Sequence, residues 1–131
     1  MSKQIKVGEY MDKTIVVDGV EYVPKGSGSV TPAKKLKGLE YVICRTYSAS
    51  VFAGYLKKRQ GKEVTLLQAR RLWYWKGASS LSQLAMEGVT RPDECKFPCE
   101  VTSVDLTEAI EIIPCTKKAQ DIINSVKIWK Q

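Results

Sequence analysis

Residues 70–88 constrain the fold of this chain most, because the hydrophobic period changes within them from that of a strand to that of a helix. The stretch opens with two arginines, followed after one leucine by three consecutive aromatic residues. Strand alternation divides these six residues between two faces. Arg71, Trp73 and Trp75 share one face, and Arg70, Leu72 and Tyr74 share the other. We therefore expect the two tryptophans to share one environment and Tyr74 to have the opposite one.

The second half of the stretch predicts a short helix. Ser80 precedes the first residue of helical period, Leu81, and Gln83 follows the serine by three positions, as in a capping box. Gly88 is placed to end the helix, because glycine readily adopts the left-handed conformation found there.

Segments rich in β-branched and aromatic residues predict further strands on both sides of this stretch. We expect strands at residues 40–47, 51–56, 63–67, 69–75, 99–106 and 109–113, with a basic turn at residues 57–62. Thr116 caps a second helix, whose apolar residues recur at helical spacing from Ala119 onward. This order predicts an α+β domain, with an antiparallel β-sheet and two helices packed on one face of it.

The N-terminal part of the chain has a different composition. Residues 14–23 predict a β-hairpin, in which Asp18 and Gly19 form a type I′ turn between β-branched runs. Residues 24–37 are rich in Gly, Ser, Pro and Lys, which is typical of a flexible linker. We therefore expect an N-terminal hairpin appendage with its linker at residues 1–37 and a compact ligand-binding domain at residues 38–131.

Positive charge is concentrated in one part of the sequence. Residues 34–71 contain ten lysines and arginines and only two acids, whereas the whole chain has a net charge of +7. Such a concentration favours a polyanionic partner such as a nucleotide or nucleic acid. A solvated face that only keeps the protein soluble is the alternative interpretation.

Several functional classes are disfavoured by the sequence. It contains no apolar run long enough to cross a membrane and no signal-peptide pattern, so we expect a cytoplasmic protein without a membrane partner. The chain has no histidine, no P-loop and no nucleophile elbow, so we expect no enzymatic activity. The four cysteines lack typical zinc-site spacing, and we expect reduced thiols, no metal and no cofactor.

The composition of residues 70–88 favours ligand binding. Tryptophan rings can stack on a base, arginine can hold a phosphate with its planar fork, and a helix N-terminus can bind an anion. Each feature also has a structural interpretation, because tryptophans in strands commonly belong to the core and serines commonly cap helices. Two lysines lie in the first turn of the last helix, where the helix dipole disfavours positive charge. A bound anion would remove this unfavourable interaction. The candidate ligand-binding residues are Arg45, Arg71, Trp73, Trp75, Ser79, Ser80, Gln83, Arg91, Lys117 and Lys118.

Three stretches, residues 70–85, 92–97 and 108–116, carry a resemblance within a match that covers about residues 41–126. The first reads Arg-Arg-Leu-Trp-Tyr-Trp-Lys-Gly-Ala-Ser-Ser-Leu-Ser-Gln-Leu-Ala. Together they resemble a family of small bacteriophage proteins similar to the Thoeris anti-defence proteins of the first type. The resemblance implies a homo-oligomeric sponge in the host cell cytoplasm that binds cyclic ADP-ribose isomers, and in some members cyclic oligonucleotides, without cleaving them.

Three alternatives to a nucleotide sponge remain open from the sequence. A single-stranded nucleic-acid-binding protein would use the basic residues 34–71 together with the tryptophans. A structural or partner-binding protein would have the tryptophans in its core. An enzyme acting on a nucleotide would need a general base, and the chain contains no histidine that could serve as one.

Overall fold

The computed structural model describes residues 15–17, 20–22 and 30–131, and the chain divides into two units, Met1–Thr31 and Pro32–Gln131. In the first unit, β2 (Ile15–Val17) and β3 (Val20–Tyr22) pair antiparallel, with Val17 opposite Val20. This pairing confirms the predicted hairpin strands. The predicted type I′ turn at Asp18 and Gly19 lies outside the described residues.

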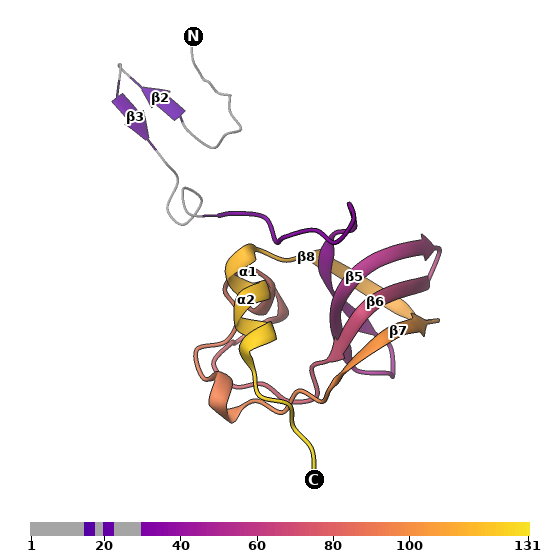
Figure 1. Ribbon diagram of the computed structural model, residues 1–131. Coiled ribbons are helices and arrows are strands. Elements are labelled where there is room, and N and C mark those ends of the chain that lie inside the picture. Colours follow the sequence, from indigo (N-terminus) through magenta and orange to yellow (C-terminus); the bar gives the residue numbers. More distant parts are fainter. Residues whose placement is uncertain (1–14, 18–19, 23–29) are drawn as a thin grey trace. The chain divides into compact units, whose positions relative to one another are not determined.

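The second unit is built on a five-stranded antiparallel sheet in the order β7-β6-β5-β4-β8. The strands are β4 (Tyr41–Thr46), β5 (Val51–Gln60), β6 (Glu63–Arg71), β7 (Glu100–Leu106) and β8 (Ala109–Pro114). β7 and β8 lie at opposite edges of the sheet, although only Thr107 and Glu108 connect them. So short a link requires the sheet to curl until its two edges approach each other (Figure 1).

The inside of this curled sheet forms one of two hydrophobic cores. Successive residues of a strand point to opposite faces, and in β4 Val42 and Cys44 point to the inside together with Phe52 of β5. The other residues of this inner core come from the remaining strands: Val64, Leu66, Ala69 and Leu106.

The outer face of the sheet packs against two helices, α1 (Leu81–Glu87) and α2 (Lys117–Ser125), which lie together on one side of it (Figure 1). This second core, which we call the helix-side core, joins Tyr41 and Ile43 of β4 to apolar residues of both helices and of the connecting loops. A short 3₁₀ turn, η1 (Pro92–Glu94), follows α1. The predicted α+β architecture is therefore confirmed. In the part of the chain that the structure describes, neither helix has the length and apolar character of a membrane span.

β6 corrects one sequence prediction, because the strands expected at residues 63–67 and 69–75 form a single strand that ends at Arg71. Gln68, at the expected break, has a φ of 49° and forms a β-bulge opposite Gly54. A Cβ atom at Gly54 would lie 3.0 Å from the Ala69 Cα atom, so the two strands approach closely only because residue 54 is glycine.

The basic segments also differ from expectation. Residues 57–60 continue β5 instead of forming a turn, which is confined to Gly61 and Lys62. Residues 32–37, expected in the flexible linker, lie with the second unit as a strap. The Ala33 N–H donates to the Cys115 carbonyl at 3.1 Å. The Gln120 side chain accepts from the Lys34 N–H at 2.7 Å and donates to the Lys34 carbonyl at 2.9 Å.

Candidate functional site

The two tryptophans expected to share one environment do not do so, which corrects the predicted alternation. It holds as far as Leu72, which is buried in the helix-side core. Beyond Arg71 the chain leaves the sheet, so strand geometry no longer sets the side-chain directions. Trp73 is 56% exposed, Tyr74 is 45% exposed, and Trp75 packs against the helix-side core.

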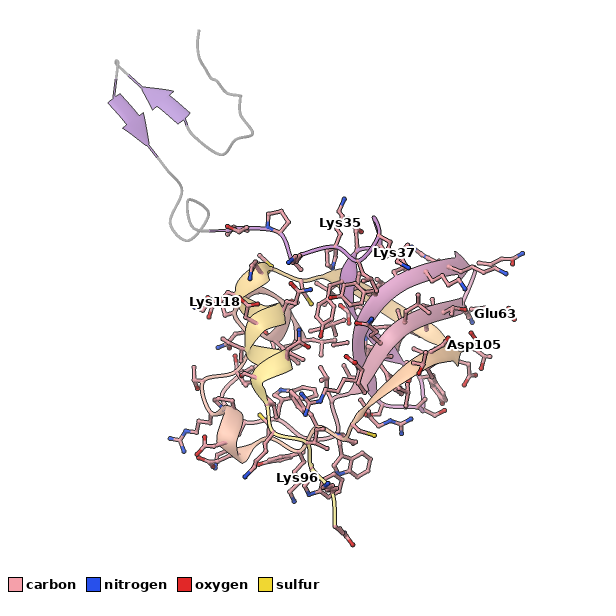
Figure 2. The ribbon with its side chains drawn as sticks, viewed as in Figure 1. Lys35, Lys37, Glu63, Lys96, Asp105 and Lys118 are labelled. Atoms are coloured by element: carbon pink, nitrogen blue, oxygen red, sulfur yellow. The ribbon has the colours of Figure 1, made fainter. Side chains whose placement is uncertain are left out.

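Two exposed aromatic rings and a lysine meet at one end of the molecule, and we call Tyr74, Lys96 and Trp129 the aromatic–lysine cluster. The Lys96 Nζ atom lies 5.7 Å from the centre of the Tyr74 ring and 5.8 Å from that of Trp129. Both distances are within the range of cation–π attraction. Figure 2 shows Lys96 at this end, on the loop that follows η1.

Backbone hydrogen bonds bring these three residues together from distant parts of the sequence. Tyr74 and Lys96 exchange N–H donations to each other's carbonyl, at 3.2 and 2.7 Å. The Trp129 N–H donates to the Phe97 carbonyl at 2.9 Å, and Ile128 forms a parallel bridge with Phe97. The cluster thus rests on two short bridges, one on each side of the loop that carries Lys96.

Arg70 supports the cluster from inside the protein. Its side chain is 6% exposed and donates hydrogen bonds to four backbone carbonyls. These are the carbonyls of Pro98, Ile123, Phe97 and Val126, at 2.9, 2.9, 3.1 and 2.6 Å. The Phe97 carbonyl therefore accepts from both Arg70 and Trp129. Burial lowers the pKa of Arg70, but an arginine remains charged at neutral pH.

Arg71 points to the opposite face of β6 from Arg70. Its guanidinium carbon lies 4.6 Å from the centre of the Phe52 ring, so the side chain covers one end of the inner core. The side chain is half-buried, which leaves part of the guanidinium accessible. Of the predicted binding residues, Arg71 and Trp73 lie beside the aromatic–lysine cluster in sequence, three positions and one position before Tyr74.

The predicted phosphate-binding turn before α1 uses its polar groups internally. Ser80 caps the helix, with its Oγ accepting from the Gln83 N–H at 3.1 Å, which confirms the predicted cap. The Gln83 Oε1 atom accepts from both the N–H and the hydroxyl of Ser79, at 2.9 Å each. These three side chains therefore stabilise the start of the helix.

Arg91 lies close to that turn and pairs with a carboxylate. Its Nη1 atom is 3.2 Å from the Glu94 Oε2 atom, and the Lys76 Nζ atom is 3.4 Å from Oε1. Hydrogen bonds from Lys76 and Arg91 lower the pKa of the Glu94 carboxyl. Gly77 lies beside this group with a φ of 96°, and a Cβ atom there would clash with the Thr90 hydroxyl oxygen, so the position requires glycine.

The other predicted phosphate contacts are spread over separate elements. Arg45 forms an ion pair with Glu111 across β4 and β8, at 2.9 Å. Lys117 pairs with Asp121 one turn along α2, at 2.8 Å, and Lys118 is exposed on the same helix (Figure 2). These three cations lie on β4 and α2, whereas the aromatic–lysine cluster is formed by other segments of the chain.

The sequence analysis missed Lys96 and Trp129 as candidate binding residues. Trp129 follows the last helix in a short segment where two lysines flank two apolar residues, and an aromatic residue in so polar a terminal segment was the available signal. Tyr74 was expected on the face opposite to the two tryptophans, together with Leu72. Its exposure follows from the end of β6 at Arg71.

The four cysteines occupy different environments. Cys44 belongs to the inner core, Cys95 and Cys115 belong to the helix-side core, and Cys99 is exposed. Burial raises the pKa of the Cys44 and Cys95 thiols, and that of Cys115 to about 12. Among the described residues, no group of three or more potential ligands is arranged to hold a metal ion.

Residues 39–123 match the protein family described as "Domain of unknown function (DUF6948)". The match covers more than half of the chain, and the chain belongs to this family. The match includes all five strands of the second unit, the whole of α1 and all of α2 except its last two residues. Trp129 lies outside it. No curated protein and no solved structure matches the chain significantly.

Proposed function

We propose that this member of the DUF6948 family is a non-catalytic sponge that binds a cyclic nucleotide signal and withholds it from its receptor. The observation that carries the proposal is the aromatic–lysine cluster, with Arg71 and Trp73 next to it in sequence. We further propose a bacteriophage anti-defence role in the host cytoplasm, with a cyclic ADP-ribose isomer as the ligand. The resemblance of residues 70–85, 92–97 and 108–116 to phage sponges supports this role.

The chemistry of the cluster suits a nucleotide. Stacking of a base on an exposed aromatic ring is worth about 1–3 kcal/mol. The Lys96 ammonium lies within 6 Å of both ring centres, so a base stacked on either ring has a cation near its phosphate. Capture without cleavage needs no general base, which is compatible with a chain that contains no histidine.

The surface of one subunit supports a ligand site shared between subunits. Four cavities among the described residues measure about 50 to 270 Å³, and Tyr74, Lys96 and Trp129 line none of these four. Sites for small molecules are usually enclosed, with volumes of about 300–1,000 Å³. We propose, as the resemblance to phage sponges implies, a homo-oligomer in which a second subunit covers the aromatic–lysine cluster.

The length of β6 separates the rings from the basic turn, so the proposed small ligand would use the ring end alone. The nine residues of β6 separate the basic turn at Gly61 and Lys62 from Arg71. At about 3.3 Å per residue, this separation is roughly 25–30 Å. A mononucleotide or cyclic dinucleotide cannot reach both ends of the strand.

A capture assay tests this function. The protein is incubated with cyclic ADP-ribose isomers, filtered and denatured, and the released ligand is quantified by chromatography. We expect intact ligand from the wild type, and at least a fivefold loss of affinity in Tyr74→Ala and in Trp129→Ala, from about 1 kcal/mol or more of lost stacking.

Tyr47→Ala is the matched control, because Tyr47 is 77% exposed and lies in the turn between β4 and β5, outside the cluster. Its ligand capture should equal that of the wild type. Absence of bound ligand in the wild type would refute the proposal for this ligand class, and release of a converted product would show an enzyme instead.

A further inference from the structure

The ten cations of residues 34–71 fall into two groups in the structure. Three of them are engaged within the fold: Arg45 with Glu111, Arg70 with four carbonyls, and Arg71 with the Phe52 ring. The other seven, six lysines and one arginine, have exposed side chains. Six of these exposed residues form what we call the basic end: Lys35, Lys37, Lys57, Lys58, Arg59 and Lys62.

The basic end gathers residues from the strap and from the hairpin of β5 and β6. Pairing of β4 with β5 stops at Tyr55, so the rest of β5 extends past β4. The Leu56 N–H donates to the Glu40 carbonyl at 2.8 Å, which fixes the end of the strap beside this extension. Lys37 stands at the tip of the turn between Leu36 and Leu39. Figure 2 shows Lys35 and Lys37 beside β5, and Lys96 at the opposite end of the molecule.

The charges of the basic end are poorly balanced. Two acids, Glu40 and Glu63, belong to the same stretches of chain, and Asp105 of β7 lines a cavity together with Lys58 and Glu63. Glu111 of β8 lines a cavity with Arg59, but it forms its ion pair with Arg45. Six cations therefore face three acids that have no ion pair among the described residues. Within residues 30–131, none of the six cations forms an ion pair with a described residue. Clustered like charges destabilise a folded protein through repulsion, and a bound polyanion removes that cost.

We propose that the basic end binds the sugar–phosphate backbone of duplex nucleic acid, without reading its bases. Duplex DNA carries one negative charge per about 1.7 Å of its axis, so several phosphates can face such a surface at once. The segment from Lys57 to Lys62 contains no aromatic residue on which an unpaired base could stack. This binding surface is independent of the aromatic–lysine cluster and of the proposed sponge function.

Fluorescence anisotropy with a mixed-sequence DNA duplex of roughly 20 base pairs tests the proposal, at about 50 and about 200 mM salt. We expect Lys57→Gln/Lys62→Gln to weaken duplex binding about tenfold at the lower salt concentration. The slope of log affinity against log salt should fall by about 2, close to 0.9 for each lost phosphate contact.

The matched control is Lys127→Gln/Lys130→Gln, which removes the same charge from two exposed lysines of the C-terminal segment. It should retain at least half of the wild-type affinity for the duplex. Equal losses in the two double variants would overturn the proposal, because net charge alone would then explain binding. Tighter binding of a single strand of the same length, lost in Trp129→Ala, would overturn it as well. The capture assay on both double variants keeps this result separate from the sponge function.

Discussion

The two ends of β6 use positive charge in different ways. At the aromatic end, Arg70 is buried among carbonyls, Arg71 lies on a ring and Lys96 lies between two rings. At the basic end, six cations are exposed and form no ion pair with a residue in 30–131. Cations at the first end therefore stabilise a particular arrangement of the chain, whereas those at the second are available to a partner. A single basic window in the sequence contains both kinds.

The largest effect is expected at Arg70, which tests most directly whether the cations of the aromatic end stabilise the fold. Arg70→Met removes four hydrogen bonds to backbone carbonyls, of which those of Pro98 and Val126 lose their side-chain donor, and should lower the free energy of unfolding by about 3 kcal/mol. Arg71→Met loses a contact with a ring and should cost about 1 kcal/mol or less. Urea unfolding measures both. Equal losses at the two positions would contradict the supporting role of Arg70.

An intermediate effect is expected at Gln120, which is 3% exposed and holds the strap that carries Lys35 and Lys37. Gln120→Leu removes its hydrogen bonds to Lys34 and to the Tyr55 hydroxyl, and should cost about 1–2 kcal/mol. Hydrogen exchange of the Lys34 amide should become faster, and duplex binding should weaken because the strap no longer fixes two cations of the basic end.

Asn124→Leu, at an exposed position of the same helix, is the control for Gln120. It should leave both amide exchange and duplex binding unchanged. If Gln120→Leu accelerated exchange without weakening duplex binding, the strap would not belong to the basic end.

The smallest effect is expected for Glu94, which pairs with two of the cations outside the basic end. Hydrogen bonds from Lys76 and Arg91 lower the pKa of Glu94 in the folded protein. Its stabilising contribution is therefore present above the pKa of the unfolded state and is lost as the pH falls through the folded pKa. The difference in stability between wild type and Glu94→Gln should be small at neutral pH and should vanish in acid. A difference independent of pH would show that ionisation of Glu94 is not involved.

Local features of the fold were predictable because their causes lie within a few residues. The caps of both helices, at Ser80 and Thr116, follow from side chains that bond to backbone N–H groups three positions later. Gln68 was interpreted as a break between strands, and it is a bulge within one strand. The sequence pattern of a bulge and that of a short turn are similar, and only the pairing with β5 distinguishes them.

The aromatic–lysine cluster was not predictable from local pattern. Tyr74, Lys96 and Trp129 meet through bridges between segments far apart in the chain, and periodicity carries no information about such bridges. Alternation beyond Arg71 failed for the same reason, since the end of a strand depends on where its partner stops. Trp73 was correctly singled out as a candidate binding residue, and it is exposed, but Trp75 lies against the core.

The short link between β7 and β8 also affects how the second unit reaches its fold. β8 pairs with β4, and Val42 opposite Pro114 closes a loop of roughly seventy residues, which on its own carries a large entropic cost. Once the meander from β4 to β7 has curled, however, Thr107 and Glu108 are the only residues that must be ordered to bring β8 to β4. The most distant strand pairing of the sheet thereby becomes a local step, in which four strands act as the template for the fifth.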